Sequence, residues 1–232
     1  MSSPSSSSSS FDSLFSEHDD ATTPTAAKRE CPLVPGLWVF PSLLPDDIAR
    51  ETLHAVGEDD LFSGGNRDQV MLFEAPESTL TSRPSSLPTY INSLIRVLEE
   101  SLKCRIPIEA HRVVFHQSLA RQVILNLYPP GQGISPHVDL PNRYADGILG
   151  CSLIGGCVMR LTKGEEVHQV YMPPRTVYVF TGEARWEWKH GIEGKYDDLV
   201  ERLAGGQAET LLRDLRVSVT FRWMKEGADL LS

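Results

Sequence analysis

Long apolar runs are missing from this chain of 232 residues. No stretch of eighteen consecutive apolar residues occurs, which excludes a transmembrane helix. The first twenty residues, MSSPSSSSSSFDSLFSEHDD, lack the basic and apolar regions of a signal peptide, and they are acidic where a mitochondrial transit peptide would be rich in arginine. We therefore expect a soluble protein of the cytoplasm or nucleus that makes no contact with a membrane.

Cysteine is also scarce, with four residues and no CxxC pair, so a cysteine-bound zinc site has no support. Cys151 and Cys157 flank an apparent hairpin, CSLIGGC. If Gly155-Gly156 forms its two-residue turn, Cys151 lies opposite Arg160, which argues against a disulfide with Cys157. Reduced thiols fit an intracellular location.

Positive charge is in deficit, with 22 basic against 31 acidic residues. Removing the five acids and two bases of residues 1–30 leaves 26 acids against 20 bases. Nucleic-acid-binding proteins usually carry a basic face. Such a strip can coexist with a negative total, and the alternative is that its candidates are dispersed surface arginines: Arg67, Arg83, Arg112, Arg121 and Arg185.

Composition divides the chain in two. Residues 1–30 are mostly serine, threonine, proline and acid, which predicts a disordered tail. Phe11, Leu14 and Phe15 within it are either a short docking motif or scattered apolar residues. Residues 31–232 are long enough for one domain with a full core, and no internal repeat occurs. We expect a monomer.

Two helices are expected in the first half of the domain. Proline and acids at Pro45-Asp46-Asp47 predict the start of one, which ends at Gly57 and has Ile48, Leu53 and Val56 along one face. Apolar residues recurring at helical spacing predict a second over residues 89–103. Between the two, Gly64-Gly65 and the serine and proline content indicate a loop, and VMLF a short strand.

Strands dominate the rest of the chain, separated by turn sequences such as PPGQG, GG and TKGEE. This pattern predicts an α+β, mainly β fold with an antiparallel jelly-roll barrel, in which residues 196–205 form a short helix or loop. The expected strands, in order, are LVPGLWVF, RVVF, QVILNLY, ILGCSLI, CVMRL, VHQVYM, TVYVF and RVSVTFRW.

The most informative stretch is residues 121–140, RQVILNLYPPGQGISPHVDL. His137 and Asp139 are two residues apart in extended chain, so their side chains point the same way. His190, in the loop-like segment TGEARWEWKHGI, offers a third ligand. Two imidazoles and a carboxylate form the facial triad of non-haem Fe(II) oxygenases. The alternative for the HxD pair alone is a pair of ordinary polar residues near a sheet edge.

The last expected strand alternates strictly. Val217, Val219, Phe221 and Trp223 share one face, and the other face carries Arg216, Ser218, Thr220 and Arg222. A polar face of this kind often meets solvent. An arginine at each end also suits a dicarboxylate, because guanidinium groups bind carboxylates with two parallel hydrogen bonds.

The segments NLYPPGQGISPHVD, HGI and RVSVTFR, in this order and spacing, resemble the AlkB family of Fe(II)/2-oxoglutarate dioxygenases. The likeness covers about residues 36–225 and is closest in look to the oxygenase domain of the AlkB-homologue tRNA wobble-uridine hydroxylases. It implies a double-stranded β-helix (jelly-roll) core with N-terminal supporting helices, and Fe(II), 2-oxoglutarate and dioxygen as cofactors. The implied metal ligands are His137, Asp139 and His190, and no further catalytic residue is implied. The implied 2-oxoglutarate-binding residues are Asn126, Tyr128, Arg216, Ser218 and Arg222.

By the same resemblance, the enzyme would hydroxylate or oxidatively demethylate a modified or alkylated nucleobase in RNA (tRNA) or single-stranded DNA. The same chemistry on a protein side chain or small molecule is the alternative, and a catalytically inactive binding module is a third. Candidate substrate contacts are Asn66, Arg67, Gln69, Met71, Phe73, Arg185, Trp186 and Trp188. Core packing is the competing explanation for Met71, Phe73 and the two tryptophans.

Overall fold

The structure is a computed structural model that describes residues 25–63, 68–75, 85–203 and 207–228. Within these ranges no helix is long and apolar enough to cross a membrane. The helices are α1 (Asp46–Glu58), α2 (Thr89–Leu102), α3 (Ile108–Phe115) and α4 (Gly182–Trp186). The strands are β1 (Leu37–Phe40), β2 (Gln69–Glu74), β3 (Arg121–Tyr128), β4 (Ile134–His137), β5 (Tyr144–Ile154), β6 (Cys157–Lys163), β7 (Glu166–Met172), β8 (Val177–Phe180), β9 (Lys189–Ile192), β10 (Asp197–Val200), β11 (Glu209–Leu212) and β12 (Arg216–Met224).

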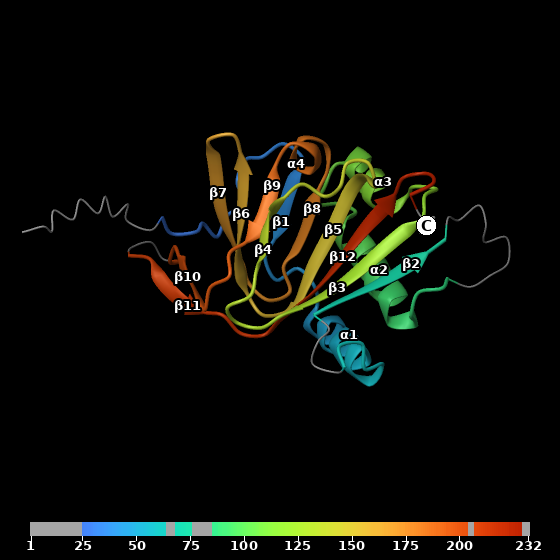
Figure 1. Cartoon of the computed structure of the whole chain (residues 1–232), viewed down its shortest axis with the longest axis horizontal. Helices are drawn as coiled ribbons and strands as arrows, with labels where there is room; N and C mark the ends of the chain where they lie inside the picture. The colour runs from blue at the N-terminus through green and yellow to red at the C-terminus, as the bar shows by residue number, and fades with distance from the viewer. Residues whose placement is uncertain (1–24, 64–67, 76–84, 204–206, 229–232) are drawn as a thin grey trace, which may run out of the picture.

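Two antiparallel sheets face each other and form the barrel (Figure 1). The major sheet has the strand order β1-β8-β5-β12-β3-β2, and the minor sheet has the order β4-β9-β6-β7. Strands β10 and β11 form a separate hairpin beside the minor sheet. The predicted fold class, mainly β with a double-stranded β-helix core, is confirmed.

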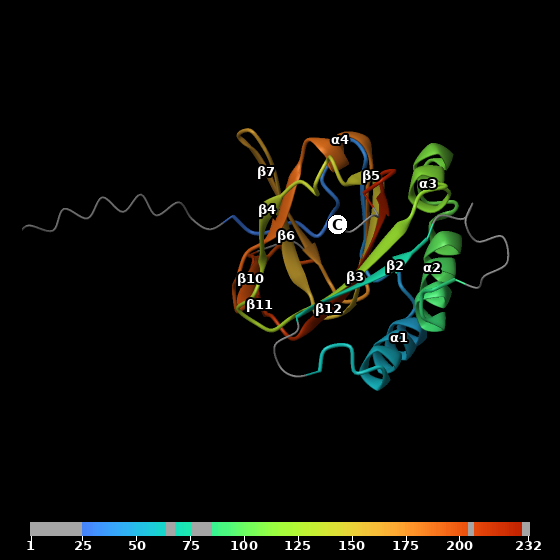
Figure 2. The same ribbon diagram turned by 45° about the vertical axis from the view of Figure 1, so that its right-hand side comes forward.

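The helices α1, α2 and α3 cover the outer face of the major sheet (Figure 2). Helix α2 buries Ile91, Leu94, Ile95, Leu98 and Leu102, which fall on one face at helical spacing as predicted. These side chains pack in one cluster with the residues of β3, β5, β8 and β12 that face the helices, including Val217, Val219 and Phe221. Since alternate residues of β12 point outward to the helices, the others point into the barrel. The helices thus cover one face of the major sheet, and the site lies on the opposite face, inside the barrel.

Four predictions from local sequence were wrong. The segment RVVF is the last turn of α3, which follows Pro107 and places Ala110, Val114 and Phe115 in the core. Residues 197–200 form β10, paired with β11. The segment TGEARWEWKHGI is not a loop, since it contains α4 and β9. Finally, CSLIGGC is not a hairpin, because β5 belongs to the major sheet and β6 to the minor one.

The boundary of the predicted tail also differs. Residues 1–24, with the candidate docking motif, lie outside the described residues. Residues 25–30 are part of the fold, because Ala27 is buried and bridges to Val200, and Lys28 bridges to Val170. The Arg29 guanidinium pairs with Glu209 at 2.7 Å. All four cysteines are free, as expected.

Candidate metal and cosubstrate site

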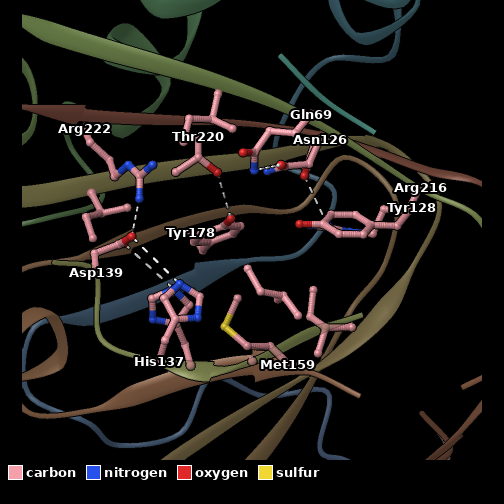
Figure 3. Close-up of a pocket in the computed structure, with 17 residues that line it drawn as sticks. Gln69, Asn126, Tyr128, His137, Asp139, Met159, Tyr178, Arg216, Thr220 and Arg222 are labelled. Atoms are coloured by element: carbon pink, nitrogen blue, oxygen red, sulfur yellow. Dashed lines mark hydrogen bonds and ion pairs between the residues drawn. The ribbon is translucent and has the colours of Figure 1, made fainter. Parts of the chain in front are cut away.

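A pocket lies between the two sheets (Figure 3). Its polar lining comes from β2, β3, β8 and β12 of the major sheet, from β4 and β9 of the minor sheet, and from the loop after β4. It brings together, from distant parts of the chain, His137, Asp139, His190, Asn126, Tyr128, Arg216, Ser218 and Arg222. Every residue predicted to bind the metal or 2-oxoglutarate lines this one pocket.

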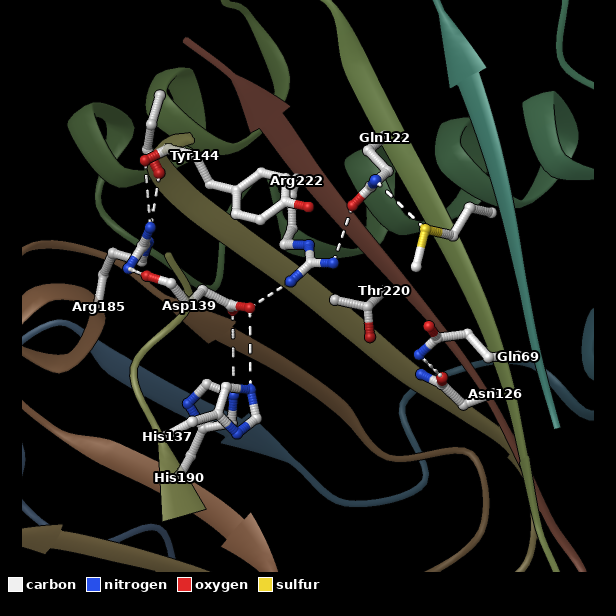
Figure 4. A network of polar contacts seen from close by, with 12 residues as sticks. Gln69, Gln122, Asn126, His137, Asp139, Tyr144, Arg185, His190, Thr220 and Arg222 are labelled. Carbon is white, nitrogen blue, oxygen red and sulfur yellow. Dashed lines mark hydrogen bonds and ion pairs between the residues drawn. The ribbon is translucent and has the colours of Figure 1, made fainter. Parts of the chain in front are cut away.

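The three predicted metal ligands lie at one end of it (Figure 4). His137 ends β4 and His190 lies in β9, and the two are direct partners in the pairing of these strands. Their Nε2 atoms lie 3.9 and 4.0 Å from the two carboxylate oxygens of Asp139, respectively. One ligand atom from each of the three residues lies within 4.8 Å of the other two. This arrangement suits a single metal ion with two imidazole ligands and one carboxylate ligand.

Glycine permits the close approach of β4 and β9 that creates this pairing. A Cβ atom on Gly191 would lie 2.8 Å from the backbone nitrogen of Pro136 and 2.9 Å from the carbonyl oxygen of Ile134. Any side chain there would push β4 away and separate the two histidines. Gly191 thus lets β9 pass close to β4, which carries His137.

Both imidazoles are prepared for metal binding. The Nδ1 atom of His137 lies 2.9 Å from the carbonyl oxygen of Ser135, and a hydrogen bond there leaves Nε2 free on the side of Asp139. Burial lowers the pKa of His190 to about 4, against the opposing effect of the Asp139 carboxylate. His190 is therefore neutral at neutral pH, which is the form that binds metals.

Two arginines fix Asp139 from either side. Arg222 of β12 donates from Nη1 to Oδ1 of Asp139, and its Nη2 donates to Oε1 of Gln122 at 2.8 Å. Arg185 of α4 is only 2% exposed and donates to the carbonyl oxygens of Asp139 (2.9 Å), Tyr144 (3.2 Å) and Ala145 (3.2 Å). One arginine thus holds the carboxylate and the other holds the backbone that carries it.

The other end of the pocket contains a buried cation. Arg216 is 4% exposed and donates to the hydroxyl oxygens of Ser218 (3.2 Å) and Ser152 (3.0 Å). Its Nε has no hydrogen-bond partner, and within the described residues no carboxylate lies within 4.0 Å of it. A buried charge without a counterion is costly. The surroundings of Arg216 therefore suit an anionic ligand. Together, Arg216 and the three candidate metal ligands supply the groups that Fe(II) and a dicarboxylate would need.

Asn126 and Tyr128 line the wall between the two ends of the pocket. They share a face of β3, and in the strand register Asn126 is opposite Ser218 and Tyr128 opposite Arg216. The Asn126 amide oxygen accepts a 2.7 Å hydrogen bond from Gln69 of β2. These placements agree with the predicted roles of Asn126 and Tyr128 beside the cosubstrate.

The candidate substrate contacts separate into three groups. Gln69 lines the pocket, and Met71 (47% exposed) and Phe73 (38% exposed) follow it on the same face of β2, so neither is a core residue. Arg185 and Trp188 are both buried, and Trp188 packs in the core between the sheets, so neither lines the pocket as the structure has it. Asn66 and Arg67 lie outside the described residues, as does Arg83.

The predicted basic strip is not assembled from the arginines that the structure describes. Arg185 is buried beneath the ligand loop. Arg121 lies over the ring of Trp223 and 3.6 Å from Glu74. Arg112 is exposed on α3, on the outer side of the major sheet. Among these three, only Arg112 presents an exposed guanidinium to solvent.

Sequence reasoning missed two polar residues of the pocket and its surroundings. Tyr178 lies in VYVF, a strand buried at all four positions, so no alternation marks a polar face. Ser152 lies in an equally buried run of β5, where a small hydroxyl carries no signal of its own. Only the register of β5 against β12, in which Ser152 is opposite Ser218, identifies its role.

Comparison with known proteins agrees with this geometry. The family model described as "2OG-Fe(II) oxygenase superfamily" matches residues 75–222, which is more than half of the chain. An uncharacterized protein, L905, of Acanthamoeba polyphaga mimivirus is 32% identical over 145 residues, covering 60% of this chain and 59% of that protein.

Two further relatives carry functional names. The tRNA (carboxymethyluridine(34)-5-O)-methyltransferase alkbh8 of Xenopus tropicalis is 36% identical over 117 residues, covering 46% of this chain and 19% of that protein. The mitochondrial alpha-ketoglutarate-dependent dioxygenase alkB homolog 7 of Mus musculus is 32% identical over 115 residues, covering 48% of this chain and 49% of that protein. The matches span less than two thirds of each of these three relatives. The chain belongs to the 2OG-Fe(II) oxygenase superfamily, which implies Fe(II), 2-oxoglutarate and dioxygen as its cofactors.

Proposed function

We propose that this enzyme hydroxylates or oxidatively demethylates a modified or alkylated nucleobase in RNA, such as tRNA, or in single-stranded DNA. The sequence likeness to a relative named for a tRNA modification supports the proposal. We further propose that the enzyme is a monomer and that it acts in the cytoplasm or nucleus.

His137, Asp139 and His190 would hold the iron, and Arg216, with Ser218, Asn126 and Tyr128 beside it, would hold 2-oxoglutarate. With both bound, iron supplies the oxidation, in which dioxygen converts 2-oxoglutarate to succinate and carbon dioxide and a substrate C–H group to an alcohol. An alcohol formed on an N-methyl carbon collapses to formaldehyde and the demethylated base, whereas on other carbons it persists. The protein contributes position: Arg222 orients Asp139, and Arg216 supplies the charge for the distal carboxylate.

The observation that carries the substrate assignment is the apolar character of the pocket mouth. Met71 and Phe73 extend the pocket face of β2 beyond Gln69, and Ile134 of β4 lines the opposite wall and is also exposed. Apolar and aromatic side chains suit the flat faces of an unstacked base. A base within a duplex would have to be flipped out to reach the iron, so single-stranded substrates are favoured.

A second candidate substrate is a protein side chain or a small molecule. Two observations favour it. The formal net charge is −9, and the arginines expected to form a basic strip are buried, paired or on the far side of the major sheet wherever they are described. A protein with few phosphate contacts should bind nucleic acid weakly.

Nucleoside mass spectrometry of cellular RNA and DNA, with and without the gene, tests the proposal. A modified or methylated nucleoside should change in amount when the gene is deleted and recover with the wild-type gene, but not with a His137→Ala variant. Binding to single-stranded RNA across a salt series separates the two candidates, because phosphate contacts make the affinity fall as salt rises. Unchanged nucleosides, together with no salt-dependent binding, would favour the second candidate.

A further inference from the structure

Four cations surround the turn that follows Asp139. The backbone N–H groups of Arg143 and Tyr144 close this turn, since both donate to the carbonyl oxygen of Leu140, at 3.1 and 3.0 Å. The chain just after β12 lies against it, because the N–H of Lys225 donates to the carbonyl oxygen of Arg143 at 2.9 Å. With two arginines of the candidate metal site these side chains form a cationic cluster, which consists of Arg143, Arg185, Arg222 and Lys225.

Two aromatic rings hold the cationic cluster in place. The Tyr144 ring has the Arg222 guanidinium 4.1 Å and the Arg143 guanidinium 5.8 Å from its centroid. The Trp186 ring of α4 has the Lys225 ammonium 5.4 Å from its centroid. Cation–π contacts of this kind position a charge. They do not neutralise it, because the ring has no net charge.

Acidic side chains also leave the cationic cluster largely unpaired. In the described part of the chain, Arg222 alone of the four has a carboxylate within 4.0 Å, that of Asp139. The Nε of Arg143 is buried and has no hydrogen-bond partner there. Asp146 accepts hydrogen bonds from two backbone N–H groups, and Glu226 is exposed and forms no ion pair with any described residue. A local excess of positive charge with an unsatisfied N–H suits an anionic ligand from solvent.

The cationic cluster adjoins the metal end of the pocket. Figure 4 shows Arg222 and Tyr144 on the far side of Asp139 from the two histidines. Leu140, the residue after this metal-ligand candidate, is 55% exposed, so the turn that carries Arg143 reaches the surface. A nucleotide whose base enters the pocket keeps its phosphates outside. Cations on the surface next to the metal end are therefore placed to meet them.

We propose that Arg143 and Lys225 bind backbone phosphates of a single-stranded nucleic acid whose base is oxidised in the pocket. The inference rests on the proposed nucleobase substrate, and it assigns the phosphates to cations other than those of the predicted basic strip. The net charge of −9 does not oppose it. Salt screens exposed charges beyond roughly 8 Å at physiological ionic strength, so the charges beside each phosphate decide its binding. Such contacts fix the strand in place without reading its sequence.

The test is fluorescence anisotropy with a labelled oligouridylate of about twelve nucleotides, titrated with the full chain from about 50 to 200 mM salt. Mn(II) and 2-oxoglutarate are present at the same concentrations for every variant. Each phosphate contact to a single strand contributes about 0.7 to the slope of log affinity against log salt. Arg143→Gln/Lys225→Gln should therefore flatten this slope by about 1.4, and Lys225→Gln alone, at an exposed position, by about 0.7.

Arg96→Gln/Arg105→Gln is the matched control. It removes the same two charges from exposed positions on α2 and just after it, among the helices outside the major sheet (Figure 2). This variant should keep the wild-type slope. Far-ultraviolet circular dichroism checks that every variant is folded.

The outcomes separate the inference from the proposed function. Salt-dependent binding by the wild type with the same slope in Arg143→Gln/Lys225→Gln would overturn the phosphate contacts and leave the nucleobase function standing. Equal flattening in the control would also overturn them, since it would reflect net charge alone. Tighter binding of a labelled glutamate peptide of the same length would assign the cationic cluster to an acidic protein instead. A wild type without salt-dependent RNA binding would overturn the nucleobase function and this inference together.

Discussion

Arg222 and Asp139, 83 positions apart in the sequence, form an ion pair that joins β12, inside the major sheet, to the loop after β4. The Arg222 guanidinium also lies over the ring of Tyr144, 4.1 Å from its centroid, and is held by Gln122. Because several partners fix this arginine, it can fix the carboxylate in turn. The orientation of one metal-ligand candidate therefore depends on side chains that would never touch the metal.

Replacing Arg222 by glutamine should weaken metal binding. Partners that orient a metal ligand typically contribute about 10–100-fold to metal affinity, and we expect a loss in that range. Calorimetric titration with Mn(II) measures it. Arg112→Gln, on the outer surface of α3, is the control and should bind metal as the wild type does. Equal Mn(II) affinities for the two variants would show that Arg222 does not contribute to metal binding through Asp139.

Replacing Arg216 by lysine should impair cosubstrate binding even though the charge is kept. A lysine cannot reproduce the forked donors that reach Ser152 and Ser218 and suit a carboxylate. We expect the KM for 2-oxoglutarate to rise roughly tenfold or more, with a smaller effect on kcat. Uncoupled conversion of 2-oxoglutarate at varied concentration gives both constants. A KM equal to that of the wild type would contradict a direct role for Arg216.

A methyl group at Gly191 should disrupt the metal site more than the fold. In Gly191→Ala the added carbon meets the backbone of Ile134 and Pro136, so β4 must move away from β9 and His137 from His190. We expect metal affinity to fall while far-ultraviolet circular dichroism stays close to that of the wild type. Gly57→Ala in α1 is the matched control, because no atom lies within 4 Å of the added carbon. It should keep its metal affinity and gain roughly 0.4–1 kcal/mol of stability.

Replacing Arg185 by methionine should destabilise the protein. The guanidinium donates to three carbonyl oxygens, and its removal leaves these acceptors without their partner in a buried site. The free energy of unfolding should fall by about 3 kcal/mol, since each unsatisfied buried group costs about 1 kcal/mol or more. Urea denaturation measures this change. A loss below about 0.5 kcal/mol, as expected for a surface arginine, would refute the structural role.

Several parts of the structure followed from sequence patterns. The alternation in β12 separated Val217 and Val219, which face the helices, from Arg216 and Ser218, which line the pocket. Helical spacing identified α2 almost to the residue. The HxD spacing and the distal His190 predicted three side chains that the fold brings within reach of one ion. In each case the signal lies in a period or in residue types whose chemistry is specific.

The errors arose where the outcome depends on tertiary partners. RVVF has strand-like residues, but Pro107 begins a helix that packs on the major sheet and includes them. Gly155-Gly156 has the composition of a hairpin turn, although the two strands beside it pair in different sheets. From the sequence alone, a charged side chain such as Arg185 is expected to be exposed. In the fold, carbonyl oxygens of distant residues accept its hydrogen bonds, and this allows it to be buried. Local sequence does not determine which strand or loop will be the neighbour.

The most direct test of the central claim is the conversion of 2-oxoglutarate to succinate by the purified protein with Fe(II), ascorbate and dioxygen, without added substrate. The wild type should form succinate, and removal of iron by a chelator should stop it. His137→Ala should form none, whereas His54→Ala, an exposed histidine on α1, should match the wild type. Succinate formation at the wild-type rate by His137→Ala would contradict the assignment of the metal site.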